Sequence, residues 1–238
     1  MNPAKELAIL NSHIIECTKC PRLVKHRENV AQHKRASFRD WDYWGRPLPG
    51  FGDPRAQLLI IGLAPAAHGG NRTGRIFTGD RSGDFLFAML HKAGFANQPT
   101  SVHRDDGLQL RNAYISAIAR CAPPENKPLP EEILNCRSYI LREIDVLRPR
   151  AVLALGRIAF EGYLRCLQAR GEIASLTPYR FAHGATHPIP TAAGQPHLFA
   201  TYHPSQRNTQ TGLLTPQMFM AVLRKIQRHL SPASSPAR

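Results

Sequence analysis

The sequence predicts an α/β fold, in which helices cover both faces of a parallel sheet. Four short apolar runs are candidate strands, and they alternate with segments whose apolar residues recur at helical spacing. This alternation favours parallel strands joined by right-handed crossovers. The chain has 238 residues, a length that is enough to bury one ordinary core, and it contains no internal repeat. We expect a single domain over residues 1–230 and a disordered Pro/Ser-rich tail at 231–238.

The first part of the chain is expected to pack onto this domain without joining its sheet. Pro3–Glu16 carries apolar residues at helical spacing and runs into the sequence Cys17-Thr-Lys-Cys20. Residues 22–56 are basic and contain an aromatic cluster at 41–44, followed by prolines. We therefore predict that 17–56 is a loop-rich segment that closes onto the first strand.

Residues 57–80 form the centre of the predicted site. The run 57–63 has no helical period, as expected of a strand buried on both faces. The loop that follows is rich in glycine, and ligands of open α/β sheets bind at the carboxyl ends of strands. A helix is predicted to follow Ser82 as its N-cap. The alternative is a long surface loop, and the absence of Gly-Lys-Ser/Thr before the helix argues against a P-loop.

The second half of the chain continues the alternation. Strands are predicted at 112–121, 151–155 and 197–202. Helices are predicted after Pro130, after Gly156 and after Thr215, and Pro is favoured in a first helical turn. The connection 171–196 is rich in Pro and Gly, with weak strand character at 179–181, and 206–212 is predicted to be a polar loop.

The charge balance points to nucleic acid. Lys and Arg number 31 against 17 acidic residues, giving a net charge of +14, and polyanions are the expected partners of such a chain. No apolar run is long enough for a transmembrane helix, and the N-terminus lacks the apolar core of a signal peptide. We expect a cytoplasmic protein that is associated with the nucleoid through DNA binding.

Five cysteines in such a chain argue for ligands or plain thiols rather than disulfides. Cys17 and Cys20 have a metal-binding spacing, and Cys121 and Cys136 could complete a site of four thiolates. Zinc, an iron–sulfur cluster and unrelated buried thiols all remain open on the residues alone. Cys166 lies on the apolar side of its helix, so we expect it in the core.

Two polar residues stand out at the ends of predicted elements. His203 ends a candidate strand before Pro204, where it could donate a hydrogen bond to charge that develops on a leaving group. A structural histidine explains the same position equally well. Asp80 directly precedes a helix, and the residues alone slightly favour a capping carboxylate over a catalytic one.

Taken together, these motifs resemble the family 5 uracil-DNA glycosylases, the b-type iron–sulfur enzymes. The resemblance spans residues 17 to about 215, in the family's order. It is carried by GLAPAAHGGNRTGRIFTGD at 62–80, CAPPENKP at 121–128, HPSQRNTQTG at 203–212 and four cysteines. It implies a three-layer α/β/α fold with a central four-stranded parallel sheet. It also implies cleavage of the N-glycosidic bond of uracil in DNA, and a [4Fe–4S] cluster held by Cys17, Cys20, Cys121 and Cys136.

Two departures from the wider superfamily bear on the range of bases. Leu63 and Ala64 stand where many relatives carry a polar residue that handles the attacking water. Ser116 and Ala117 stand where relatives often carry an Asn that reads the uracil edge. Both departures look typical of family 5 and imply a pocket less strictly tuned to uracil. Hypoxanthine is therefore an expected second substrate.

The resemblance also suggests a role for each site residue. The damaged nucleotide is flipped out of double-stranded DNA, with single-stranded DNA as a second expected partner. Asp80 stabilises the sugar cation or positions water, His203 donates to uracil O2, and Asn126 orients base or water. Phe77 stacks on the base, and a polar loop fills the gap in the duplex. The expected substrate-binding residues are Gly62, Leu63, Ala64, Phe77, Gln206, Arg207 and Asn208.

A different class of protein would explain part of the sequence. A non-enzymatic basic metal-cluster module that binds nucleic acid accounts for the charge and the cysteines equally well. It does not explain why three strand ends carry Gly, Asp, Asn and His together. A nucleotide-handling α/β protein is disfavoured because neither a P-loop Lys nor a GxGxxG fingerprint is present. We expect an enzyme that acts as a monomer.

Overall fold

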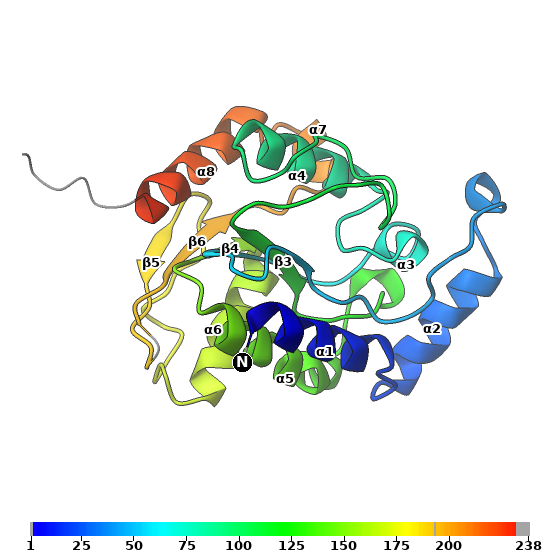
Figure 1. Cartoon of the computed structure of the whole chain (residues 1–238), viewed down its shortest axis with the longest axis horizontal. Helices are drawn as coiled ribbons and strands as arrows, with labels where there is room; N and C mark the ends of the chain where they lie inside the picture. The colour runs from blue at the N-terminus through cyan, green and yellow to red at the C-terminus, as the bar shows by residue number, and fades with distance from the viewer. Residues whose placement is uncertain (1, 193, 232–238) are drawn as a thin grey trace, which may run out of the picture.

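The computed structural model describes residues 2–192 and 194–231, and it contains a six-stranded sheet. This sheet lies between two layers of helices (Figure 1). The four inner strands run parallel to one another, whereas each edge strand is antiparallel to its neighbour. In spatial order the strands are β1 (Phe51–Gly52), β3 (Ala113–Ala117), β2 (Leu58–Gly62), β4 (Ala151–Leu155), β6 (His197–Thr201) and β5 (Thr186–Pro188). The predicted α/β fold is confirmed, with two edge strands more than expected.

The helices cover both faces of the sheet. Helices α1 (Pro3–Ile15), α5 (Pro130–Leu147) and α6 (Arg157–Ala169) lie on one face, and α4 (Arg81–Lys92) and α8 (Pro216–Leu230) on the other (Figure 1). Side chains alternate along a strand, so β2 contributes to both cores. Leu58 and Ile60 pack beneath α4 and α8, whereas Leu59 and Ile61 pack against the opposite layer. All five residues of β2 are buried as a result.

The register brings four loops to one edge of the sheet. Gly62 at the end of β2 pairs with Ala117, and Leu155 at the end of β4 pairs with Thr201. The carboxyl ends of all four parallel strands therefore lie along the same edge. The segments that leave this edge are 63–80, 118–129, 156 and 202–205.

The predicted helix starts are confirmed for α8 and α5, whereas the predicted N-cap of α4 is wrong. Thr215 accepts a hydrogen bond from Met218 N at 3.2 Å, and Pro216 occupies the first turn of α8, as predicted. Helix α5 begins at Pro130. The N-cap of α4 is Asp80 and not Ser82, because the Asp80 carboxylate accepts the Gly83 N–H at 2.9 Å.

The N-terminal segment is more regular than predicted. Residues expected to be irregular form α2 (Pro21–Gln32), which begins at a proline and buries Leu23 and Arg27 on one face, one helical turn apart. A short 3₁₀ turn, η1 (Ala36–Phe38), follows it. Figure 1 shows α2 projecting beside α3 (Gly70–Thr73), a single helical turn within the Gly-rich loop.

Several boundaries also differ from the predictions. The polar segment 206–212 forms α7 (Gln206–Gln210), because Ser205 caps it by accepting Asn208 N–H at 3.3 Å. No strand forms at 179–181, and β5 lies further along the chain. Strand β3 is only five residues long, and η2 (Pro124–Asn126) follows it.

One apolar residue of α5 faces solvent, since Leu134 is 53% exposed. The tail predicted to be disordered lies, apart from Ser231, outside the described residues. Among the helices that the structure describes, none is long and apolar enough to cross a membrane.

Candidate active site

A cavity of about 1290 Å³ opens at the carboxyl edge of the sheet. Most of the residues that the sequence predicted for the site line it. They are Leu63, Ala64, Phe77, Asp80, Asn126, His203 and Gln206. Gly62, Arg207 and Asn208 do not line the cavity. The fold thus brings three separate strand ends to one hollow.

Phe77 closes the cavity against the end of β2. A Cβ at Gly62 would lie 2.7 Å from the Phe77 ring, so glycine is needed for this approach. Gly62 therefore contributes to the site by admitting the aromatic ring and not by lining the cavity. The backbone of Phe77 has φ 55°, a left-handed conformation that is uncommon for a bulky residue. Its ring centroid lies 5.9 Å from that of His203.

Asp80 combines the two roles that the sequence left open. It caps α4 through its hydrogen bond with Gly83 N–H, and it also lines the cavity. Burial raises the pKa of the Asp80 carboxyl above its ordinary value, while the backbone N–H groups of Gly83 and Ser82 act in the opposite direction. Gly69 lies so close that any Cβ there would overlap Asp80 Oδ2. The carboxylate is thus held in a fixed, partly desolvated position.

His203 is neutral in its resting state. Burial lowers its pKa to about 4, so the imidazole carries no charge at pH 7. Its ring forms no hydrogen bond to any other described residue. The loop is fixed from behind, because Asn208 Nδ2 donates to the backbone oxygen of His203 at 2.8 Å. Asn208 therefore supports the histidine, and its side chain does not project from the surface as a wedge would.

Asn126 lies on the exposed rim of the cavity. It ends η2 in a left-handed conformation with φ 58°, and Asn is one of the few residues other than Gly that adopt this conformation readily. Gln206 and Arg207 are also exposed, at the first turn of α7. These residues surround the entrance, whereas Phe77, Asp80 and His203 lie further inside.

The N-terminal segment supplies a wall of the cavity that no sequence motif predicted. The Arg72 guanidinium lies 3.9 Å from the centre of the Phe38 ring and 4.0 Å from that of Trp41. Arg72 also donates to the backbone oxygens of His68 at 2.8 Å and Gly79 at 2.9 Å. The aromatic cluster at 41–44 was the only signal in the sequence, and it does not say where the segment folds back.

The entrance carries unpaired positive charge. Arg35, Arg81 and Arg157 line the cavity and are exposed. None of the three forms an ion pair with an acidic side chain in residues 2–192 or 194–231. Exposed, unpaired guanidinium groups are suited to phosphate oxygens, which dominate the affinity of proteins for DNA.

The four predicted ligand cysteines gather at a second place, beside α2. Cys20, Cys121 and Cys136 are buried and Cys17 is partly exposed. Arg27 Nη1 donates to Cys121 Sγ at 3.1 Å, and Asn135 Nδ2 donates to Cys20 Sγ at 3.4 Å. Burial raises the pKa of Cys121 to about 12, and the charges of Cys136 and Cys17 add to this while Arg27 opposes it. Metal coordination, which deprotonates thiols, would overcome that effect.

The surroundings of these thiols fit a thiolate-bound group better than neutral thiols. Arg27 is 4% exposed, its nearest carboxylate is 3.7 Å away on exposed Glu28, and its Nε has no partner among the described residues. A buried cation normally needs a compensating anion. No three described His, Cys, Asp or Glu side chains are arranged to hold a single metal ion. A cluster of several iron and sulfide atoms keeps its thiolates further apart than one ion does. Cys166 lies elsewhere, in the core as expected.

Comparison with known proteins extends the similarity beyond these motifs. A family model described as the uracil DNA glycosylase superfamily matches residues 49–227. The type-5 uracil-DNA glycosylase of Thermus thermophilus is 51% identical over 89% of this chain and 93% of its own length. That of Pyrobaculum aerophilum is 45% identical over 90% and 89%, and that of Mycobacterium tuberculosis 48% over 94% and 82%. A type-4 enzyme of P. aerophilum is more distant, at 29% identity over 84% of this chain.

Proposed function

This chain belongs to the uracil DNA glycosylase superfamily, and on that premise we propose that it hydrolyses the N-glycosidic bond of uracil in DNA and leaves an abasic site. The observation that carries this proposal is the convergence of Phe77, Asp80 and His203 on one cavity at the carboxyl edge of the sheet. These three side chains supply an aromatic face, a carboxylate and a neutral N–H donor.

Substrate binding begins with the phosphates. The unpaired arginines at the entrance hold the DNA backbone without reading its sequence. The target nucleotide leaves the stack, since its glycosidic bond cannot be reached inside a duplex. Gln206 and Arg207, exposed at the start of α7, are the candidates to occupy the gap. The cavity of about 1290 Å³ has ample room for a single base.

His203 acts on the departing base. As the bond breaks, negative charge develops on uracil O2, and an N–H donor aimed at that oxygen lowers the barrier. The depressed pKa means that His203 donates its hydrogen bond as a neutral imidazole and keeps its N–H proton as the base departs. The Phe77 ring provides the surface on which the base stacks, and the backbone of Leu63 and Ala64 contacts the base edge.

Asp80 acts on the sugar. Loss of the base leaves positive charge on the sugar, and a fixed carboxylate stabilises such a cation or positions the attacking water, as carboxylates do in glycoside hydrolysis. Its hydrogen bond to Gly83 N–H prevents the carboxylate from turning away. Asn126, on the rim, orients the base or the water.

The pocket has few groups that would reject other deaminated bases. Leu63 and Ala64 line it without polar side-chain atoms. Ser116, at the position where relatives carry a base-reading Asn, is fully buried and hydrogen-bonded to Glu143. We therefore include hypoxanthine among the substrates, because no side chain at these positions demands the uracil edge.

We further propose that Cys17, Cys20, Cys121 and Cys136 hold a [4Fe–4S] cluster, which would organise the loops beside the DNA and take no part in the bond cleavage. The support is the buried Arg27 guanidinium and the N–H donors aimed at Cys20 and Cys121. The enzyme is proposed to act as a monomer on double-stranded DNA in the cytoplasm, where the chromosome lies.

The first test is cleavage of a labelled duplex that holds one U·G pair, followed by alkali to cut abasic sites. A parallel duplex contains hypoxanthine, and an undamaged duplex is the control. Cleavage at uracil supports the proposed activity, and cleavage at both bases supports the wider pocket. Tight binding without cleavage of either duplex would favour the non-enzymatic nucleic-acid-binding module.

A further inference from the structure

The segment that carries both Phe77 and Asp80 has an unusual backbone. Phe77 has φ 55° and Gly79 has φ 78°, so two of four consecutive residues are left-handed. A bulky residue in this conformation persists only when surrounding contacts hold it there. What holds this turn therefore decides where the stacking ring and the carboxylate point.

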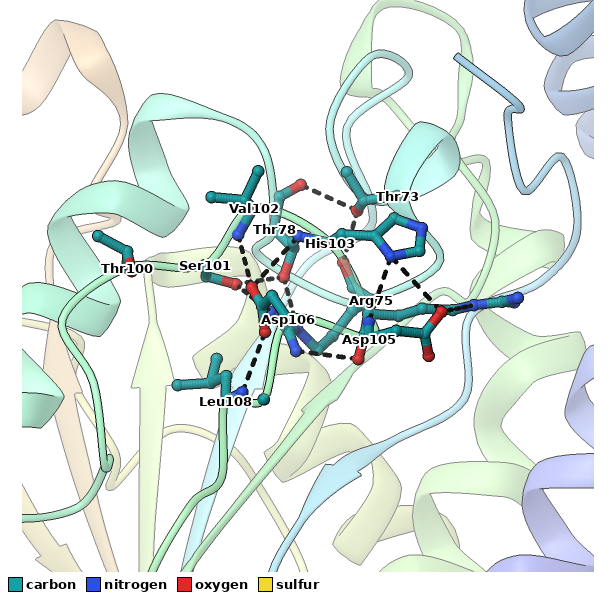
Figure 2. A network of polar contacts seen from close by, with 12 residues as sticks. Thr73, Arg75, Thr78, Thr100, Ser101, Val102, His103, Asp105, Asp106 and Leu108 are labelled. Atoms are coloured by element: carbon teal, nitrogen blue, oxygen red, sulfur yellow. Dashed lines mark hydrogen bonds and ion pairs between the residues drawn. The ribbon is translucent and has the colours of Figure 1, made fainter.

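Arg75 is at the centre of those contacts (Figure 2). Only 3% of its surface is exposed. Its Nε donates to Thr78 Oγ1 at 3.0 Å. Its Nη2 donates to Ser101 Oγ at 2.8 Å and to Asp106 Oδ2 at 2.7 Å, and its Nη1 donates to the backbone oxygen of Arg104 at 3.2 Å. A single guanidinium thus joins the turn to the loop 101–108.

Thr78, which lies between Phe77 and Asp80, receives these contacts from two sides. Its hydroxyl shares a hydrogen bond of 2.6 Å with Ser101 Oγ, and its backbone oxygen accepts from Thr73 Oγ1 at 3.1 Å. The next residue is held as well, because Gly79 N donates to the Ser101 backbone oxygen at 3.2 Å. The turn is therefore fixed through both side chain and backbone.

Asp106 fixes the other end of this network. Its carboxylate accepts from the backbone N–H groups of Val102 at 2.8 Å, His103 at 3.2 Å and Leu108 at 3.0 Å (Figure 2). Burial raises the pKa of this carboxyl, but Arg75 and these N–H groups outweigh burial and hold it well below its ordinary range. Asp106 is thus a permanent anion that shapes loop 101–108 and anchors Arg75.

From this network we propose that Arg75 and Asp106 are positioning residues, which hold Phe77 and Asp80 in their reactive places through Thr78 and Ser101. The proposal rests on the glycosylase function proposed above. Neither Arg75 nor Asp106 lines the cavity, so neither is expected to touch the substrate. Their effect is on the chemical step, because a displacement of about 1 Å in a catalytic group can cost about 100-fold in rate.

The neighbouring residue supplies a matched control. Asp105 lies in the same loop, but its side chain is 69% exposed and pairs with exposed Arg104 and His103. Asp106→Asn and Asp105→Asn change the same chemical group at adjacent positions. Single-turnover cleavage of a uracil duplex is measured with enzyme in excess. The active fraction of each variant is first determined by titration with a duplex that contains a tetrahydrofuran abasic-site analogue.

We expect Asp106→Asn to slow the single-turnover rate constant by roughly 10- to 100-fold. Its affinity for the abasic-site duplex should stay within about threefold of wild type, and Asp105→Asn should match wild type in both. A purely structural role would lower the active fraction but leave the rate constant of the folded enzyme unchanged. Equal rate constants for the two variants would overturn the proposal.

A double-mutant cycle tests whether the effect passes through Asp80. In an Asp80→Asn background, Asp106→Asn should cost clearly less than it does in the wild-type enzyme, since one of the two groups that it positions is already gone. Effects that simply multiply would contradict the proposed route. If Asp106→Asn does not fold, Thr78→Val and Thr78→Ser replace it, because only the serine keeps the hydroxyl. Rescue by Thr78→Ser is expected, and equal loss in both would count against the network.

These outcomes are separate from a failure of the proposed function. If wild-type enzyme cleaves the uracil duplex and Asp106→Asn is as fast, only the positioning role is lost. If wild type cleaves nothing, the proposed function fails and the cycle has no rate to compare.

Discussion

Around the four cysteines, N–H donors are aimed at sulfur: the buried Arg27 guanidinium donates to Cys121, and Asn135, on the surface of α5, donates to Cys20. In the cavity at the carboxyl edge of the sheet, the His203 ring has no hydrogen-bond partner among the described residues, and burial raises the pKa of Asp80 despite its hydrogen bond from Gly83 N–H. With the proposed cluster bound, the first region would face negative charge that is always present. The second is arranged for charge that appears only as the glycosidic bond breaks, which is where preorganised groups accelerate a reaction.

The largest effect is expected from substitution of one of the four candidate ligand cysteines. Cys121→Ser removes a thiolate toward which Arg27 is directed, so the protein should lose iron and visible absorbance. Its unfolding free energy should fall by roughly 4 kcal/mol, because loss of a bound metal is among the few effects of a single substitution that are this large. The measurements are iron content per protein and thermal unfolding.

Cys166→Ser is the matched control, because Cys166 is equally buried but packs in the core beside α6. It should retain its iron. If Cys121→Ser also kept full iron content, the assignment of the four-cysteine site would be wrong.

The second region is broken by His203→Ala. Loss of one electrostatic donor typically costs about 100- to 1000-fold in rate, equivalent to about 2.7–4 kcal/mol, and we expect a single-turnover loss in that range. Iron content should not change, since His203 lies apart from the cysteines. His91→Ala, exposed in the last turn of α4, is the control and should cleave like wild type. A His203→Ala enzyme with the wild-type rate constant would show that another group supplies the donor.

Both regions could be located from local patterns in the sequence. The strand β2, the Gly-rich loop and the position of His203 at a strand end follow from local patterns of apolar residues, Gly and Pro. Because parallel strands end at one edge, these local assignments bring the loop of Phe77 and Asp80 close to His203, whereas the roles of the three residues came from the family resemblance. The cysteine spacing likewise marked the candidate ligands.

The contacts that hold these groups in place could not be predicted in the same way. Arg75 and Asp106 are 31 residues apart in the sequence. The chain has 31 basic and 17 acidic residues, so neither residue stands out before the fold pairs them. Ser82 and Asp80 are both good N-caps, so only the hydrogen bond to Gly83 decides between them. The edge strands β1 and β5 are two and three residues long, too short to show an alternating pattern.

The smallest predicted effect is a change in the free energy of unfolding, which the buried charge of Asp80 lowers. Asp80→Asn should abolish most activity but raise the unfolding free energy at pH 7, by less than about 2 kcal/mol. Asn is as good an N-cap as Asp, so the hydrogen bond from Gly83 N–H can remain. The substitution removes only the charge that burial makes unfavourable. Asp105→Asn, at an exposed site, should not produce this gain.

The dependence of this gain on pH identifies its cause. The folded-state pKa of Asp80 is raised above its ordinary value near 3.8, so the penalty exists where the carboxyl is charged in the folded protein. As the pH falls through the raised pKa toward 3.8, the folded protein takes up the proton first, and the penalty disappears. The difference in melting temperature between Asp80→Asn and wild type should therefore be largest near neutral pH and shrink in acid. A difference that stays constant with pH would mean that the gain comes from packing, and that the pocket does not hold a strained charge.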